Sequence, residues 1–292
     1  MRTLGTINQF LGITVLPTST GLLLQQTRYA EEILARAGMT NSKPVSTPSI
    51  PKAVAENSSE QFGNPKLYRQ IVGALQYLTV TRPDLSYVVN RACQQMHQPM
   101  VSDFEALKRI LRYLQGTIQH GLPINGDSLV LKSYVDSDWA GDHTDRKSTT
   151  GFCNFLGTSL VSWSVKKQTT IARSSTEAEY QAIASVTMEI IWLRQLLNEL
   201  GCSQIEPTKL YCDNTSAIAL ANNPVYHART KHIEIDCHFI RDCIKNGSIQ
   251  VHYISTQDQL ADLFTKALPS TRFKFLVNQL ITRIDSSDCR GY

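Results

Sequence analysis

The stretch Tyr134-Val135-Asp136-Ser137-Asp138-Trp139 decides which fold is predicted for this 292-residue chain. The residues Leu129–Val135 are typical of a strand, and Asp136 follows that strand directly. In open α/β sheets, ligands bind beyond the carboxyl ends of the strands, where such an acid would lie. The stretch therefore indicates a sheet with a functional edge, and the neighbouring elements indicate what kind of sheet it is.

Strands and helices alternate after this stretch. The predicted strands are Thr150–Leu156, Leu160–Val165, Lys209–Cys212 and Ile249–Ser255, and the predicted helices are Ser174–Leu200, Asn214–Ala221, Ile233–Lys245 and Gln257–Leu268. Together with Leu129–Val135 they give the order three strands, helix, strand, two helices, strand, helix. This order predicts an α/β fold with a mixed five-stranded sheet flanked by helices. We expect Trp192, within the long helix, to belong to the core.

The first 126 residues have a different pattern. The elements predicted there are strands at Gln9–Val15 and Gly21–Gln25 and helices at Gln26–Ala37, Tyr68–Val80, Leu85–Met96 and Asp103–Leu114. The region holds twelve of the 29 Lys and Arg residues but seven of the 25 acids, a positive surplus that suits a polyanionic partner. A candidate boundary at Gly121–Asp127 predicts a mainly helical region 1–126, a second domain 127–280 and a tail 281–292.

Composition excludes several classes of protein. Apolar residues make up 42% of the chain, which is enough to bury globular cores and excludes wholesale disorder. No apolar run approaches the ~18 residues of a membrane span, and the first residues do not resemble a signal peptide. The seven cysteines include no Cys-x-x-Cys pair, so neither a disulfide framework nor a zinc site is expected. We therefore expect an intracellular, cytoplasmic protein without a membrane partner.

Four acids stand where this order of elements would bring them together. Asp136 and Asp213 end predicted strands, whereas Glu179 and Asp262 lie near the starts of predicted helices. Clustered carboxylates repel one another unless cations neutralise them, and their hard oxygen atoms suit Mg²⁺ or Mn²⁺ rather than zinc. Two such ions about 3.5–4 Å apart can bind a scissile phosphate and activate a water molecule. The pattern therefore predicts metal-dependent chemistry on a phosphodiester.

Motifs in both parts of the chain extend this interpretation. The segments Tyr134–Gly141, Ser174–Tyr180, Tyr211–Asn214, Thr230–Ile233 and Leu260–Lys266 closely resemble the ribonuclease H domain of copia-type retrotransposon Pol polyproteins. The upstream segments Leu11–Ile13, Ile71–Leu78, Thr81–Asp84 and Lys108–Thr117 resemble the region that joins the polymerase palm to that nuclease. The motifs occur in the family's order over roughly residues 4–280, and it is their combination that makes the resemblance specific.

The resemblance implies a fold, an activity and a site. It implies a ribonuclease H-like domain, preceded by a reverse transcriptase thumb- or connection-like region that lacks the catalytic palm. The implied activity is endonucleolytic hydrolysis of the RNA strand of RNA–DNA hybrids, with two Mg²⁺ ions, or Mn²⁺ as a substitute, on Asp136, Glu179, Asp213 and Asp262. Asp138 competes with Asp136 and Glu177 with Glu179 for two of these positions. Because the chain contains no adjacent Asp-Asp pair, polymerase activity is not expected.

Basic side chains supply candidate contacts to the nucleic acid. They are Lys108, Arg109, Arg112, Arg146, Lys147, Lys166, Lys167 and Lys231. The implied partners are an RNA–DNA hybrid and the rest of a Pol polyprotein, and the protein would be particle-associated if it is part of an active element. The alternative hypothesis is a truncated or domesticated remnant that binds nucleic acid without catalysis. The four intact acids argue against decay of the nuclease.

Overall fold

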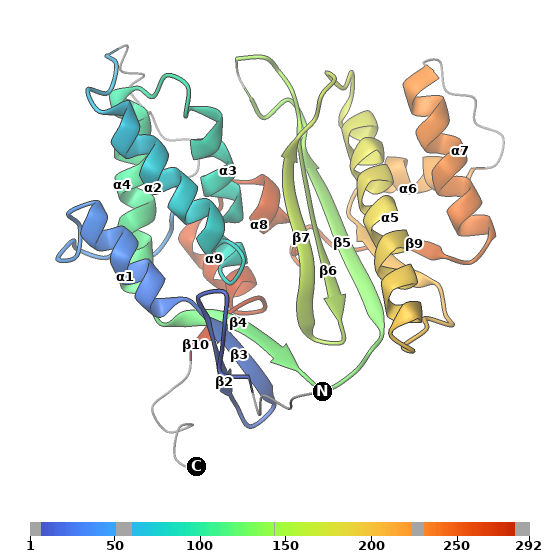
Figure 1. Ribbon diagram of the computed structural model, residues 1–292. Coiled ribbons are helices and arrows are strands. Elements are labelled where there is room, and N and C mark those ends of the chain that lie inside the picture. Colours follow the sequence, from blue (N-terminus) through green and yellow to red (C-terminus); the bar gives the residue numbers. More distant parts are fainter. Residues whose placement is uncertain (1–6, 51–59, 143, 224–230, 284–292) are drawn as a thin grey trace. The chain divides into compact units, whose positions relative to one another are not determined.

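The chain forms two compact units in the computed structural model (Figure 1). The structure describes residues 7–50, 60–142, 144–223 and 231–283, without the side chains of residues 231–234. The first unit combines the described residues up to Gly126 with those from Ala267 onward, and the second unit is Asp127–Lys266. The sequence placed the end of the second domain at residue 280, and the structure differs there. Phe273 packs edge-on against the Tyr113 ring of the first unit, with the ring centroids 5.5 Å apart.

The unit Asp127–Lys266 contains a mixed five-stranded sheet in the order β7-β6-β5-β8-β9. Its elements are β5 (Leu131–Asp138), β6 (Thr149–Leu156), β7 (Ser159–Lys167), α5 (Ser175–Glu199), β8 (Thr208–Cys212), α6 (Thr215–Asn222), α7 (Lys231–Lys245), β9 (Ile249–Tyr253) and α8 (Asp262–Thr265). The strands β5, β6 and β7 are antiparallel, whereas β8 pairs in parallel with both β5 and β9. This arrangement confirms the predicted ribonuclease H-like α/β fold.

The long helix α5 covers one face of this sheet (Figure 1). Its first turn is capped because the Ser174 hydroxyl accepts a hydrogen bond from the Glu177 backbone N–H at 3.2 Å. It ends where Gly201 adopts a left-handed φ of 77°, which a residue without a Cβ tolerates easily. Between these ends, Ile183, Val186 and other apolar side chains pack on the sheet and form the core of the unit.

The short helix α8 lies against the opposite face of β5 and β6, and it is shorter than the predicted helix Gln257–Leu268. A Cβ added at Gly151 would lie 2.6 Å from Thr265 and 2.8 Å from Phe264, so the glycine allows α8 to approach the sheet closely. Gln259 fixes the segment before α8, since its amide donates to the Val135 carbonyl at 2.9 Å. The glycine and the glutamine together hold Asp262 beside the end of β5.

The other unit combines helices with a five-stranded antiparallel sheet in the order β1-β2-β3-β4-β10. Its elements are β1 (Gln9–Phe10), β2 (Ile13–Pro17), β3 (Gly21–Gln25), α1 (Thr27–Arg36), α2 (Pro65–Leu78), a 3₁₀ turn (Pro83–Leu85), α3 (Ser86–Gln94), α4 (Val101–Gly116), β4 (His120–Asn125), α9 (Ser270–Val277) and β10 (Thr282–Arg283). The strands β4 and β10 and the helix α9 were not predicted from the sequence. The candidate boundary at Gly121–Asp127 overlaps β4. Pro123 is tolerated in this strand because β10 pairs only with His120 and Gly121, which leaves β4 an edge strand at the proline.

A buried ion pair joins α4 to the 3₁₀ turn of this unit. The Arg82 guanidinium donates to both oxygens of Asp84, at 2.9 and 2.7 Å, and both side chains are almost fully buried. The Tyr113 hydroxyl of α4 donates to the same carboxylate at 2.8 Å. Arg82 also donates to the Thr117 carbonyl at 2.8 Å, just beyond the end of α4. The network therefore neutralises the buried Arg82 and Asp84, and it fixes the 3₁₀ turn to the C-terminal end of α4.

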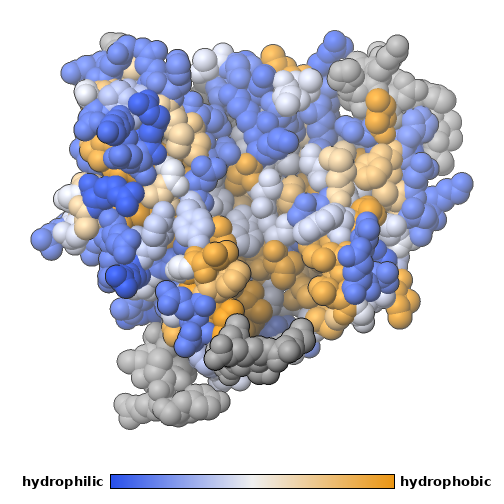
Figure 2. Space-filling view, in the orientation of Figure 1, coloured by the Kyte–Doolittle hydropathy of each residue, from blue (hydrophilic) through white to orange (hydrophobic). Residues whose placement is uncertain are grey.

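Apolar side chains gather on the surface around the C-terminal half of α5 (Figure 2). Met188, Trp192, Leu196 and Leu200 are spaced four residues apart and are exposed. The prediction that Trp192 belongs to the core is therefore wrong, since 54% of the residue is exposed. Helical periodicity alone cannot show this, because α5 is apolar on more than one side. None of the helices among the described residues is long and apolar enough to cross a membrane.

We predict that Asp84→Asn lowers the free energy of unfolding of this unit by about 3–5 kcal/mol, because Arg82 stays buried without a counter-charge. Urea unfolding measures the loss. The control is Glu32→Gln, which breaks an ion pair with Arg28 whose side chains are 53% and 93% exposed, and which should change stability by less than about 1 kcal/mol. Equal losses in the two variants would contradict the role given to the buried pair.

Candidate active site

Two of the four predicted acids reach the same edge of the sheet because β5 and β8 are parallel neighbours. Asp136 lies near the carboxyl end of β5, and Asp213 follows the last residue of β8. Asn214 then caps α6, since its side-chain oxygen accepts from the Ala217 backbone N–H at 3.0 Å. Asp213 therefore lies in the short connection between the end of β8 and the start of α6.

Asp262 joins Asp136 through a shared lysine. The Lys266 Nζ lies 3.0 Å from Oδ1 of Asp136 and 2.7 Å from Oδ1 of Asp262. The Thr265 hydroxyl donates a short hydrogen bond to Oδ2 of Asp136. Asp136 is 1% exposed and Asp262 is 3% exposed, so these charges lie almost entirely out of water. The pair depends on α8, which supplies Asp262 and Thr265 and is followed by Lys266.

Glu179 reaches the cluster from the second turn of α5. Its Oε1 accepts a hydrogen bond from the Ser137 backbone N–H at 3.0 Å, directly after Asp136. Its Oε2 lies 3.8 Å from the Cys212 thiol sulfur. One ligand atom from each of Glu179, Cys212 and Asp213 lies within 4.8 Å of the others. The four predicted acids thus form two adjacent pairs, Asp136 with Asp262 and Glu179 with Asp213.

The two competing acids have other partners. Asp138 lies two residues beyond Asp136, and its carboxylate packs against Gly141 in the turn that follows β5. Glu177 accepts a hydrogen bond from the Arg173 backbone N–H at 2.9 Å and belongs to the cap of α5. The geometry therefore favours Asp136 and Glu179 as members of the cluster.

The electrostatics of the site follow from burial and like charge. Burial first, and the charge of the nearby Asp136 second, together raise the pKa of Glu179 to about 9. Burial also raises the pKa of Asp136 to about 6, although Lys266 opposes this shift. The pKa of Lys266 lies above its ordinary value because the two aspartates outweigh the effect of burial. The site therefore favours any cation that can neutralise its carboxylates.

The donor set fits divalent metal ions. The four acids offer hard carboxylate oxygens, and among the described residues Lys266 is the only cationic side chain that forms ion pairs with any of them. Glu179 is 5% exposed and has one backbone N–H and a thiol as its hydrogen-bond partners. A divalent cation would reduce the repulsion among these carboxylates.

The basic residues predicted in the first unit have partners within that unit. Lys108 forms an ion pair with Glu105 at 2.5 Å on the surface of α4. Arg109 donates to the Thr47 hydroxyl at 2.9 Å, and Arg112 donates to the Lys43 carbonyl at 2.8 Å. The two arginines therefore hold the segment around residues 43–47 against α4, a role that the sequence did not show.

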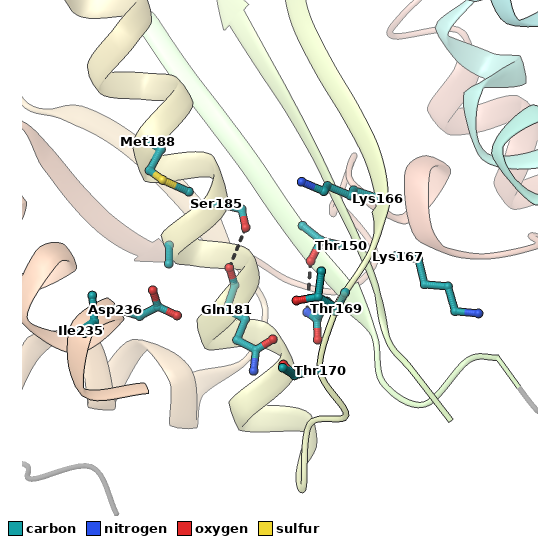
Figure 3. Close-up of a pocket in the computed structure, with 12 residues that line it drawn as sticks. Thr150, Lys166, Lys167, Thr169, Thr170, Gln181, Ser185, Met188, Ile235 and Asp236 are labelled. Carbon is teal, nitrogen blue, oxygen red and sulfur yellow. Dashed lines mark hydrogen bonds between the residues drawn. The ribbon is translucent and has the colours of Figure 1, made fainter. Parts of the chain in front are cut away.

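The basic residues of the ribonuclease H-like unit Asp127–Lys266, the nuclease-like unit, lie in two settings. Lys167 is clamped by Asp142 and Asp145, at 2.5 and 2.9 Å. Lys166 points to the other side of β7, into a hollow of about 350 Å³ between β7 and α5 (Figure 3). Among the described residues, no carboxylate forms an ion pair with Lys166, Arg146 or Lys147. The side chain of Lys231 lies outside the described residues.

Several residues of the site were not assigned a role from the sequence. Lys266 and Thr265 lie in the segment Leu260–Lys266, which resembles the family. The spacing of four residues from Asp262 to Lys266 is typical of an ion pair on a helix and could have indicated this contact. Gln168 has no such signal, yet its amide donates to the Ala178 carbonyl at 2.9 Å and to the Thr150 hydroxyl at 3.0 Å. Gln168 therefore ties the end of β7 to the first turns of α5, beside Glu179.

Curated proteins similar to this chain include polyproteins of plant transposons. The chain is 47% identical over 284 residues to the "Retrovirus-related Pol polyprotein from transposon RE1" of Arabidopsis thaliana, an alignment of 96% of the chain and 19% of the polyprotein. It is 41% identical over 284 residues to the Pol polyprotein from transposon TNT 1-94 of Nicotiana tabacum, covering 94% of the chain and 21% of that protein. The chain thus spans about a fifth of the length of these relatives.

A shorter relative is aligned over most of its own length. An uncharacterised mitochondrial protein of Arabidopsis thaliana is 52% identical over 193 residues, covering 66% of this chain and 80% of that protein. No family model matches the chain.

Solved structures show weaker similarity. An RNase H1 isolated from compost is 12% identical with a TM-score of 0.37, covering 47% of this chain and 93% of that one. A foamy viral protease-reverse transcriptase in complex with dsDNA is 13% identical with a TM-score of 0.42, covering 85% of this chain and 44% of that one. The fold is therefore assigned from strand order and pairing.

We predict that Glu179→Gln raises the stability of the metal-free protein at pH 8 by about 1–3 kcal/mol. Because the folded-state pKa of Glu179, about 9, lies above its unfolded value, the folded state binds more protons. Stability therefore falls as pH rises from about 4 to 9, and the amide removes this loss while keeping an acceptor for Ser137. Urea unfolding in EDTA at pH 4 and pH 8 should show the gain only at pH 8.

The control for this prediction is Glu177→Gln, which changes an acid of the same helix that caps α5. It should not stabilise the protein at either pH. A Glu179→Gln protein that is no more stable than the wild type at pH 8 would show that the buried carboxylate costs nothing there.

Proposed function

This chain belongs to the copia-type retrotransposon Pol polyprotein family, and we propose that it is a metal-dependent endonuclease that hydrolyses the RNA strand of RNA–DNA hybrids. The observation that carries the proposal is the convergence of Asp136, Glu179, Asp213 and Asp262 at one edge of a ribonuclease H-like sheet. The sequence motifs that resemble the family's nuclease contain these four residues. Family membership and site geometry therefore support the same activity.

The four acids would hold two Mg²⁺ ions, with Mn²⁺ as a substitute. When bound, such ions activate a water molecule and stabilise the leaving oxygen of a phosphodiester. The protein's own contribution is to keep the ligands in place. Ser137 N–H orients Glu179, Thr265 orients Asp136, and the Thr256 hydroxyl donates to Oδ2 of Asp213 at 2.8 Å. These partners fix one oxygen each of Glu179, Asp136 and Asp213.

The choice of RNA would depend on the sugar. Only RNA offers 2′-hydroxyls in a wide and shallow minor groove, and contacts to phosphate and sugar carry no sequence information. In the nuclease-like unit, Arg146, Lys147 and Lys166 are the candidate contacts to the nucleic-acid backbone, since Lys167 is neutralised by two aspartates. We therefore propose cleavage without sequence preference and with a marked dependence on salt.

A second candidate function is a non-catalytic remnant that binds nucleic acid. The observation that favours it is the shorter relative, since the chain covers 80% of the uncharacterised mitochondrial protein of Arabidopsis thaliana at 52% identity. Against it stands the cost of keeping Asp136, Glu179 and Asp262 buried, because a protein without metal chemistry gains nothing from that cluster.

We predict that the purified protein cleaves the RNA strand of a labelled RNA–DNA hybrid in Mg²⁺, and that Asp213→Asn lowers the rate at least about 100-fold. The reason is the loss of a charged metal ligand with little change in shape. Single-stranded RNA and duplex DNA should stay intact, and EDTA should abolish cleavage. Gel analysis of the labelled strand measures the rates.

Asp258→Asn is the matched control. Asp258 is an exposed acid in the connection between β9 and α8, and it lies outside the cluster. It should cleave at the wild-type rate. Uncut hybrid with the wild type, or equal cleavage by Asp213→Asn, would reject the catalytic role and favour the remnant.

A further inference from the structure

The ammonium of Lys266 lies between two of the acids that would hold metal. It contacts Oδ1 of Asp136 at 3.0 Å and Oδ1 of Asp262 at 2.7 Å. The other oxygen of Asp136 accepts from the Thr265 hydroxyl. Both oxygens of Asp136 are therefore engaged by groups from the end of α8. A divalent ion on the two Oδ1 atoms would be repelled by the positive charge that lies at hydrogen-bond distance from both.

The lysine is the more exposed partner in this contact. The side chains of Asp136 and Asp262 are 2% and 5% exposed, whereas that of Lys266 is 34% exposed. Lys266 also follows a helix of only four residues and has extended backbone angles, with φ −130° and ψ 147°. Its four-carbon stem can thus turn toward solvent without unfolding α8, while the aspartates stay fixed between the sheet and the helix.

We propose that Lys266 is a built-in counter-ion, which occupies one cation position of the site in the absence of metal and is displaced when a divalent ion binds Asp136 and Asp262. This inference rests on the proposed metal-dependent function. The ammonium neutralises buried carboxylates that would otherwise repel one another, so it stabilises the ligands before metal arrives. It also competes with the ion, so metal affinity reflects the difference between two cations.

Two other roles for Lys266 predict different results. A lysine that only holds the aspartates in position would weaken metal binding when removed. A lysine that only contacts the substrate would leave metal binding unchanged. Only competition predicts that removal of the ammonium makes metal binding tighter, so the sign of the change in affinity distinguishes the three roles.

The experiment is calorimetric titration of the full chain with Mn²⁺, using wild type, Lys266→Met and Lys167→Met. Lys167→Met is a matched control because its ammonium is also held by two aspartates, at 2.5 and 2.9 Å, outside the cluster. We expect Lys266→Met to bind Mn²⁺ about tenfold more tightly than the wild type, since two charge-assisted hydrogen bonds no longer have to be broken. Lys167→Met should bind as the wild type does.

A second measurement uses the unaltered protein and does not depend on the folding of a variant. Lysines are acetylated with a water-soluble ester, and the modified peptides are quantified by mass spectrometry with and without Mn²⁺. Lys266 should react several-fold faster in Mn²⁺, whereas Lys167 should react at an unchanged rate. The comparison of two clamped lysines in one sample separates displacement from a general effect of the ion.

Each result has one consequence. Unchanged or weaker Mn²⁺ binding by Lys266→Met, or Lys266 that stays protected at saturating Mn²⁺, overturns the counter-ion role while the metal site stands. A wild type that binds no Mn²⁺ overturns the proposed function itself, and the inference with it. Tighter binding together with faster acetylation supports both.

Discussion

Repulsion among buried carboxylates is the constraint on which the nuclease-like unit depends. Asp136, Glu179 and Asp262 are each at most 5% exposed, and they share one edge of a single sheet. Water cannot screen these charges, and a buried charge without a partner costs several kcal/mol. Two hydrogen-bond donors, the Ser137 backbone N–H and the Thr265 hydroxyl, and the ammonium of Lys266 contact these acids. The contacts that pack α5 and α8 against the sheet also fix the positions of Glu179 and Asp262.

The stability for such a cluster has to come from elsewhere in the unit. The core between α5 and the sheet supplies burial of apolar surface, with side chains such as Ile183 and Val186 fully enclosed. On the other face, Gly151 lets α8 approach until Thr265 and Phe264 would touch a Cβ. A larger residue there would push α8 outward and take Asp262 away from Asp136. Gly151 thus links the packing of α8 on the sheet to the position of Asp262 beside Asp136.

The sequence predicted the sheet and the acids because their signals are local. Asp213 follows a short strand and precedes a cap at Asn214, and both features lie in consecutive residues. By contrast, β4 was missed because it overlaps the candidate boundary at Gly121–Asp127. The pairing that makes it a strand comes from β3 and β10, which are far away in sequence. The roles of Arg109 and Arg112 were missed for the same reason, since their partners lie more than 60 residues away.

The charge balance of the second half of the chain takes on a different meaning once these contacts are known. Residues 127–292 hold 17 basic and 18 acidic side chains, which indicates no preference for a polyanion. Yet three of the acids are buried in the cluster, and two more, Asp142 and Asp145, are bound to Lys167. Acids that are enclosed or paired contribute little to the field at the surface, so the exposed Arg146 and Lys166 weigh more than the total suggests. Metal bound to the cluster would shift the local charge further toward the positive, which is the sign that a nucleic-acid backbone requires.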